Sequence, residues 1–91
     1  MSVIARIRRK VVSDQVFFSQ HVLNDKLSQF NLAQEDVLVA MLGGKVGWKD
    51  TNDPRGTVYH MICETSGGLM LDVRCRFTSL EYLLIITFDE Y

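Results

Sequence analysis

Cysteine and proline are scarce in this chain, and no apolar run in it is long. The 91 residues include two cysteines and one proline. Cys63 and Cys75 have no C-x-x-C or Cys/His ligand spacing, which argues against a metal site or a disulfide and favours two reduced, buried thiols. The longest apolar run, residues 82–86, is far shorter than the roughly 18 residues of a membrane-spanning helix. We therefore expect a cytoplasmic protein that binds no metal and no membrane.

Charge of one sign is also not in large excess. The net charge is −1, with six basic and four acidic residues in positions 1–46 and four basic and seven acidic residues in positions 47–91. Strong nonspecific binding to nucleic acid needs a globally basic chain, so any nucleic-acid site here must be local. Basic residues near the start interrupt the apolar core that a secretory signal needs: Arg6, Arg8, Arg9 and Lys10.

The length allows one domain, and the residue patterns divide it into a helical half (1–44) and a sheet half (45–91). The apolar fraction of 47% and the charged fraction of 23% are ordinary for a globular domain. Ser2 is placed to cap a first helix that runs to about Val12. Its basic side chains, Arg6, Arg9 and Lys10, form either a solvated face or a basic edge for phosphate.

Two more helices are expected before the period of the apolar residues changes from 3.6 toward 2 residues. Residues 16–18 look like an apolar connector, after which Ser19 caps a second helix that Asn31 interrupts. A third helix begins near Ala33 and ends at Gly43-Gly44, where glycine tolerates the left-handed conformation common after a helix.

The second half follows the two-residue period of strands. We expect strands near residues 45–49, 57–64, 69–77 and 81–89, connected by the turn Asp53-Pro54-Arg55-Gly56 and by a hairpin loop over residues 65–68. The last strand is apolar on both faces, which is typical of a central strand. The prediction is an α+β domain: two to three N-terminal helices packed on an antiparallel sheet of about four strands.

Several landmarks follow one another in an order that resembles a known family. They are Ser19-Gln20-His21-Val22, Leu32-Ala33-Gln34-Glu35-Asp36-Val37, Gly43-Gly44, Asp53-Pro54-Arg55-Gly56 and Ile85-Ile86-Thr87-Phe88-Asp89-Glu90-Tyr91. The series, over about residues 16–91, is similar to a small bacterial domain family of unknown function with Ser-x-His-Ala at a helix start. That family is related to the BrnT, MqsR and RelE toxins.

The resemblance implies a RelE-like fold, a curled antiparallel sheet packed on N-terminal helices. For many relatives it also implies metal-free cleavage of RNA by the toxin of a toxin–antitoxin pair, without a cofactor. The partners it implies are RNA and an antitoxin or another protein, and a homodimer remains open.

Metal-free cleavage needs a base for the ribose 2′-OH and cations for the phosphate, tasks that suit histidine and arginine. The chain has two histidines. His21 is either a pocket residue that faces the sheet or a helix-start histidine with a local hydrogen bond. His60 is either a catalytic group or a core-edge histidine bonded to a backbone carbonyl.

The remaining candidates come from the strands and turns. Arg74 and Arg76 share one strand face with Asp72, as a phosphate clamp or as part of a salt-bridged, exposed strand. Tyr91 is a further catalytic candidate, or a frayed terminus. The substrate-binding candidates are Arg55, Lys49 and Trp48, of which Trp48 could stack on a base or anchor a protein partner.

Our hypothesis from the sequence is a RelE/BrnT-like toxin-type endoribonuclease with His21 as base or pocket organiser. The alternative is a non-catalytic protein-interaction module that keeps the fold, which the mildly acidic second half favours.

Overall fold

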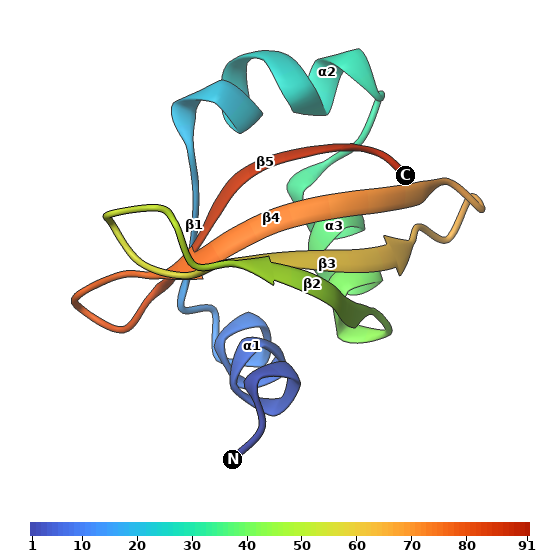
Figure 1. Ribbon diagram of the computed structural model, residues 1–91. Helices are drawn as coiled ribbons and strands as arrows, with labels where there is room; N and C mark the ends of the chain where they lie inside the picture. The colour runs from blue at the N-terminus through green and yellow to red at the C-terminus, as the bar shows by residue number, and fades with distance from the viewer.

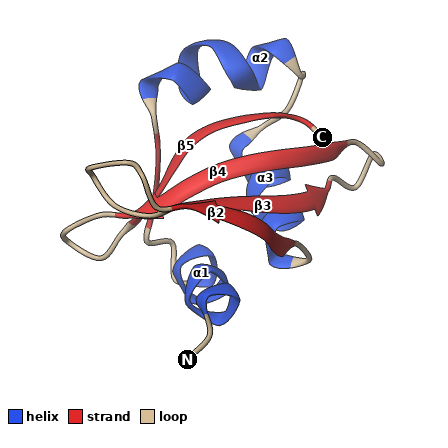
Figure 2. Ribbon diagram, in the orientation of Figure 1, coloured by secondary structure: helices blue, strands red, loops and turns tan.

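Five strands form one sheet in the order β1-β5-β4-β3-β2 in the computed structural model, which describes all 91 residues. The helical elements are α1 (Val3–Val12), the short π-helix η1 (Val22–Lys26), α2 (Leu27–Gln29) and α3 (Gln34–Leu42). The strands are β1 (Val16–Phe18), β2 (Lys45–Asp50), β3 (Val58–Glu64), β4 (Met70–Phe77) and β5 (Leu83–Glu90). Figure 2 shows the helices and strands in separate colours. The predicted α+β fold is confirmed, with five strands in place of about four.

The additional strand is β1, for which the sequence predicts only an apolar connector; that prediction is wrong. It pairs in parallel with β5, with Val16 opposite Leu83 and Phe18 opposite Ile85. Three residues are too few to show an alternating pattern, and their partner lies at the far end of the chain. The pairing makes β5 an internal strand, as its apolar run predicts, with Leu83 and Ile85 fully buried.

The first helix follows its prediction and is tied to α3. Ser2 Oγ accepts a hydrogen bond from the Ala5 N–H at 3.2 Å and so caps α1. On the same helix, Arg8 donates to the Leu42 carbonyl at 3.1 Å and to the Gly44 carbonyl at 3.2 Å. Carbonyls at a helix C-terminus have no partner within the helix, so Arg8 satisfies groups that would otherwise need water.

Neither glycine after α3 adopts the predicted left-handed conformation, and only Gly44 has a steric need for glycine. Gly43 has a φ of −97°, so the helix does not end in a left-handed residue there. Gly44 instead lies so close to β3 that a Cβ would be 2.8 Å from Cys63 Cβ and 3.0 Å from the Ile62 carbonyl oxygen. Gly44 therefore allows the close approach of the loop to β3, whereas a Cβ at Gly43 would meet only the Ala40 carbonyl oxygen, at 3.9 Å.

The main core lies between the helices and one face of the sheet. α3 contacts β3, α1 contacts α3 and β5, and η1 contacts β5. In Figure 1, α3 lies behind the sheet, while η1 and α2 lie along β5. The fully buried residues with the largest side chains are Phe88, Ile7, Met41, Met61, Leu71, Leu83 and Ile85. None of the helices has the length and apolar character needed to cross a bilayer.

The other face of the sheet is termed the open face. Leu71, Val73 and Cys75 of β4 are core residues, so the alternation of a strand places Asp72, Arg74 and Arg76 on the opposite side. His60 lies between the core-packed residues Tyr59 and Met61, and therefore also belongs to the open face.

Candidate functional site

His60 is the most closely held polar group on the open face. Its Nδ1 lies 3.0 and 3.1 Å from the two carboxylate oxygens of Asp72. The two side chains are only 12% and 10% exposed. A carboxylate can only accept a hydrogen bond, so Nδ1 donates to Asp72, while Nε2 has no hydrogen-bond partner in the protein. The contact with a carboxylate, in place of the expected backbone carbonyl, orients the ring.

Trp48 stacks on the His60 ring. The ring centroids are 4.4 Å apart with an interplanar angle of 23°. Trp48 lies opposite His60 in the β2–β3 register, next to an irregularity in the pairing at Gly47. A Cβ at Gly47 would lie 2.7 Å from Ile62 Cγ1, so the absence of a side chain lets β2 approach β3. Trp48 is 45% exposed and thus offers an aromatic surface beside the histidine.

Arg74 lies directly across from His60 in the β3–β4 register. Its Nε is buried and has no hydrogen bond, at 3.9 Å from Asp72 Oδ2. The side chain as a whole is 41% exposed. Asp72 thus contacts the guanidinium of Arg74 only loosely, at Nε, and the outer nitrogens of Arg74 stay available to an anion.

A shallow pocket of about 300 Å³ lies beside His60 and Arg74. Its volume is at the lower end of the roughly 300–1,000 Å³ common for ligand sites. The lining residues are Asp50, Asp53, Val58, His60, Arg74, Ile86 and Thr87. Because the two carboxylates of the lining are at the β2–β3 end, a phosphate is favoured on the Arg74 side of the pocket, and a group that donates hydrogen bonds is favoured beside Asp50.

The turn between β2 and β3 contains its own ion pair. Arg55 donates to Asp53 from Nε at 3.2 Å and from Nη2 at 3.1 Å. These hydrogen bonds lower the pKa of Asp53 and raise the pKa of Arg55. Arg55 is therefore occupied by a neighbour, whereas Arg76 forms no ion pair and lies near enough to contribute to the lowered pKa of Asp53.

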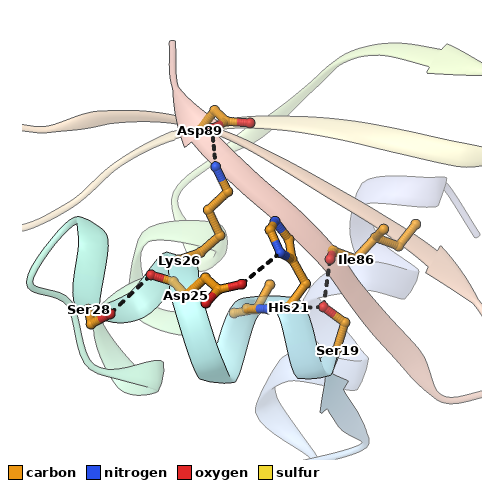
Figure 3. Close-up of polar contacts among 8 residues, drawn as sticks. Ser19, His21, Asp25, Lys26, Ser28, Ile86 and Asp89 are labelled. Carbon is orange, nitrogen blue, oxygen red and sulfur yellow. Dashed lines mark hydrogen bonds and ion pairs between the residues drawn. The ribbon is translucent and has the colours of Figure 1, made fainter.

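The structure does not bring His21 into this pocket. His21 lies at the N-terminus of η1, with Nδ1 3.4 Å from Asp25 Oδ2 and a side chain that is 52% exposed. The segment is fixed by Ser19, whose Oγ donates to the Ile86 carbonyl at 2.7 Å and accepts from the Val22 N–H at 3.2 Å (Figure 3). No ion pair or hydrogen bond joins His21 to Arg74 or Arg76.

The other candidates lie at the edges of the site. The Tyr91 ring centroid is 6.4 Å from that of Trp48, and the Tyr91 N–H donates to the Met70 carbonyl at 2.9 Å. Lys49 pairs with Tyr59, which packs against the core, so Lys49 belongs to the helical side of the sheet. The side chain of Lys49 therefore lies on the opposite face of the sheet from that of its neighbour Trp48.

Asp72 and Thr87 belong to the site but are not among the candidates predicted from the sequence. Asp72 was expected on an exposed strand, but it is only 7% exposed. It also lies opposite Asp89 in the β4–β5 register, and Lys26 binds Asp89 at 2.6 Å (Figure 3). A buried carboxylate needs a partner, so a search for the partner of Asp72 would have led to His60.

No group of three or more histidine, cysteine or acidic side chains is placed to hold a metal ion. The two thiols are buried on β3 and β4. Burial raises the pKa of Cys63 to about 11 and that of Cys75 to about 12. Since the thiolate is the nucleophilic form, burial disfavours both cysteines as nucleophiles near neutral pH.

Comparison of the chain with protein-family models, with curated proteins and with solved structures finds no match.

Proposed function

We propose that the open face binds RNA and cleaves it without a metal ion, as a toxin-type domain of the RelE/BrnT kind. The observation that carries this proposal is that His60 and Arg74 line one pocket, with Trp48 stacked on His60 beside it. His60 has an accessible Nε2 fixed by Asp72, Arg74 lies opposite with free outer nitrogens, and Trp48 provides a stacking surface. These groups can serve as a general base, as a donor to the phosphate oxygens and as a ring that stacks on a nucleobase.

The chemistry assigned to this pocket is transfer of the phosphate to the ribose 2′ oxygen. His60 Nε2 removes the proton from the 2′-OH, and this oxygen attacks the adjacent phosphorus. Arg74 stabilises the negative charge that develops on the phosphate oxygens. The 5′ oxygen leaves with a proton from solvent, so the products are a 2′,3′-cyclic phosphate and a 5′-hydroxyl end.

The charges of the open face permit this role. Three acidic side chains of the open face have a partner within the protein: Asp72 contacts His60, Asp89 binds Lys26 and Asp53 binds Arg55, whereas Asp50 at the end of the pocket forms no ion pair. Arg76 has no such partner. The cations that remain available are therefore Arg74 and Arg76, as the phosphate-clamp hypothesis requires.

Cleavage of single-stranded RNA by the full chain in the presence of a chelator tests the proposal. His60→Gln should reduce the rate by roughly 10²–10⁴-fold, the range for loss of a general base, and leave RNA affinity nearly unchanged. His21→Gln is the matched control and should retain the wild-type rate. Equal loss in both variants, or no loss in His60→Gln, would contradict the assignment.

In bacteria, induced expression should arrest growth, and His60→Gln should relieve the arrest.

A non-catalytic protein-interaction module is the second candidate. The observation in its favour is the acidic side chains Asp50 and Asp53 at one end of the pocket, which suit a basic partner better than a phosphate. A wild-type chain that neither binds nor cleaves RNA in the same assay would favour this function.

A further inference from the structure

A second hollow lies on the helical side of the molecule, between α1 and the β4–β5 turn (residues 78–82). It has a volume of about 250 Å³ and is lined by Arg6, Arg9, Lys10 and Glu81, with Met1 as the fifth residue. The turn is closed by hydrogen bonds from the Thr78 N–H to the Tyr82 carbonyl at 2.8 Å and from the Glu81 N–H to the Thr78 carbonyl at 2.9 Å. A closed turn presents Glu81 from a fixed position.

The cations of this hollow are not neutralised. Arg6 and Arg9 have no carboxylate within ion-pair distance, and Lys10 contacts only Gln15 Oε1, at 3.5 Å. Glu81 also forms no ion pair, so the three cations exceed the carboxylate by two charges. This distinguishes the hollow from Lys26 and Arg55, whose charges are paired within the protein.

The concentration of these positive charges on one helix is unfavourable. Arg6, Arg9 and Lys10 occupy positions i, i+3 and i+4 of one helix, where like charges are neighbours and repel each other. The field at the C-terminus of α1 offsets part of this repulsion for Arg9 and Lys10, which lie in its last turn. A bound anion would remove the rest.

Arg6 is ordered for such a ligand. Its guanidinium carbon lies 4.0 Å from the centroid of the Phe77 ring. A guanidinium that stacks on an aromatic ring keeps its N–H edge free for hydrogen bonds in the plane. Less side-chain entropy is then lost when that edge binds an oxygen ligand.

We propose that this hollow, termed the α1 pocket (Arg6, Arg9, Lys10 and Glu81), binds a phosphate group. A phosphate is compact, carries up to two charges and offers several oxygens to the forked donors of arginine. Its source is either a free phosphate compound or the end of an RNA strand. The site lies on the helical side, so the proposal does not depend on RNA cleavage at the open face.

The test is a titration of the full chain with inorganic phosphate at constant ionic strength, followed by amide chemical shifts. Saturable shifts are expected in residues 6–10 and 78–82. Arg9→Gln with Lys10→Gln should weaken binding by roughly tenfold or more, the effect of losing charge-assisted hydrogen bonds. The matched control, Lys45→Gln with Lys49→Gln, removes the same charge from exposed positions of β2 and should leave binding unchanged.

Glu81→Gln supplies a change in the opposite direction. Removal of the only carboxylate in the α1 pocket should tighten phosphate binding severalfold. Arg74→Gln should have no effect, so a failure at the open face is distinguishable from a failure here. The proposal is overturned if phosphate produces no saturable shift, or if the Arg9/Lys10 variant and the β2 control bind it equally.

Two oligoribonucleotides distinguish the sources. Tighter binding to the α1 pocket by a 5′-phosphorylated oligonucleotide than by its 5′-hydroxyl counterpart supports the proposal with RNA as the ligand. Equal binding of the two, together with saturable binding of inorganic phosphate, supports the proposal with a free phosphate compound as the ligand.

Discussion

The chemistry of single residues here depends on which neighbours compensate buried charge. Asp72 and Asp89 face each other across β4 and β5, an arrangement that is unfavourable for two carboxylates without partners. His60 binds the first and Lys26 binds the second. The imidazole that compensates Asp72 is thereby held with its second nitrogen available, so one contact serves both folding and the proposed chemistry.

Asp72→Asn tests this role of the carboxylate. The amide of asparagine can donate or accept a hydrogen bond, so it no longer fixes the proton on His60 Nδ1. We therefore expect cleavage to fall by roughly 10–100-fold, the usual effect of losing the group that orients a functional histidine. The fold should persist, because the substitution also removes the repulsion from Asp89. Asp89→Asn is the control in the cleavage assay and should keep the wild-type rate, since Asp89 contacts Lys26 and not the site.

The thiols give a prediction about pH. The folded-state pKa values of about 11 for Cys63 and about 12 for Cys75 lie above the ordinary value of 9.0. The unfolded chain therefore releases these protons first as the pH rises. The stability contributed by the protonated thiols is complete below pH 9.0 and is lost as the pH rises toward these folded-state values.

Urea unfolding at a series of alkaline pH values measures this effect. The free energy of unfolding should fall more steeply with pH in the wild type than in the Cys63→Ala/Cys75→Ala variant, which lacks both groups. In the native protein near neutral pH, thiol reagents should react slowly, and unfolding should expose both cysteines. Identical pH slopes in the two proteins would refute the burial effect.

At the scale of elements, glycine positions decide how closely neighbouring segments can approach. Gly44 and Gly67 both lie in short connections, yet an added Cβ would meet different surroundings. At Gly44 it would lie 2.8 Å from Cys63 Cβ and 3.0 Å from a backbone oxygen, whereas at Gly67 the nearest atom is 3.9 Å away. Only the first position therefore requires glycine for steric reasons.

Gly44→Ala should destabilise the protein by roughly 1–3 kcal/mol, because the backbone of β3 must shift to accept the methyl group. Gly67→Ala has the same effect on the entropy of the unfolded chain and should stay within about 1 kcal/mol of the wild type. Urea unfolding of both variants measures the difference. Equal stabilities would show that the loop before β2 can relax freely.

Elements with a strong local pattern could be predicted from the sequence, and those defined by distant partners could not. The Ser2 cap, the first helix and the strands after Lys45 follow from periods of 3.6 and 2 residues. β1 could not be predicted because its three residues acquire strand geometry only through pairing with β5. The same limit applies to the site: Arg74 and Trp48 could be selected by residue type, but Asp72 becomes informative only when its burial is known.

At the scale of the whole molecule, the sheet separates two kinds of surface. The helices cover one face and form the core with it, while the other face presents His60, Arg74, Arg76 and Trp48. The α1 pocket belongs to the helical side. The prediction that His21 and Arg74 form one site combined the most prominent residues of the two halves. The structure instead places His60 beside Arg74, on neighbouring strands of the sheet.

Fluorescence of Trp48, the only tryptophan of the chain, tests the central claim most directly. The indole stacks on His60 and is partly exposed on the open face, so RNA bound there must change its emission. We expect saturable quenching by single-stranded RNA that weakens with rising salt. Arg74→Gln with Arg76→Gln should remove it, while Arg55→Gln, whose charge Asp53 already binds, should not. Emission that stays unchanged at saturating RNA would contradict an RNA site on the open face.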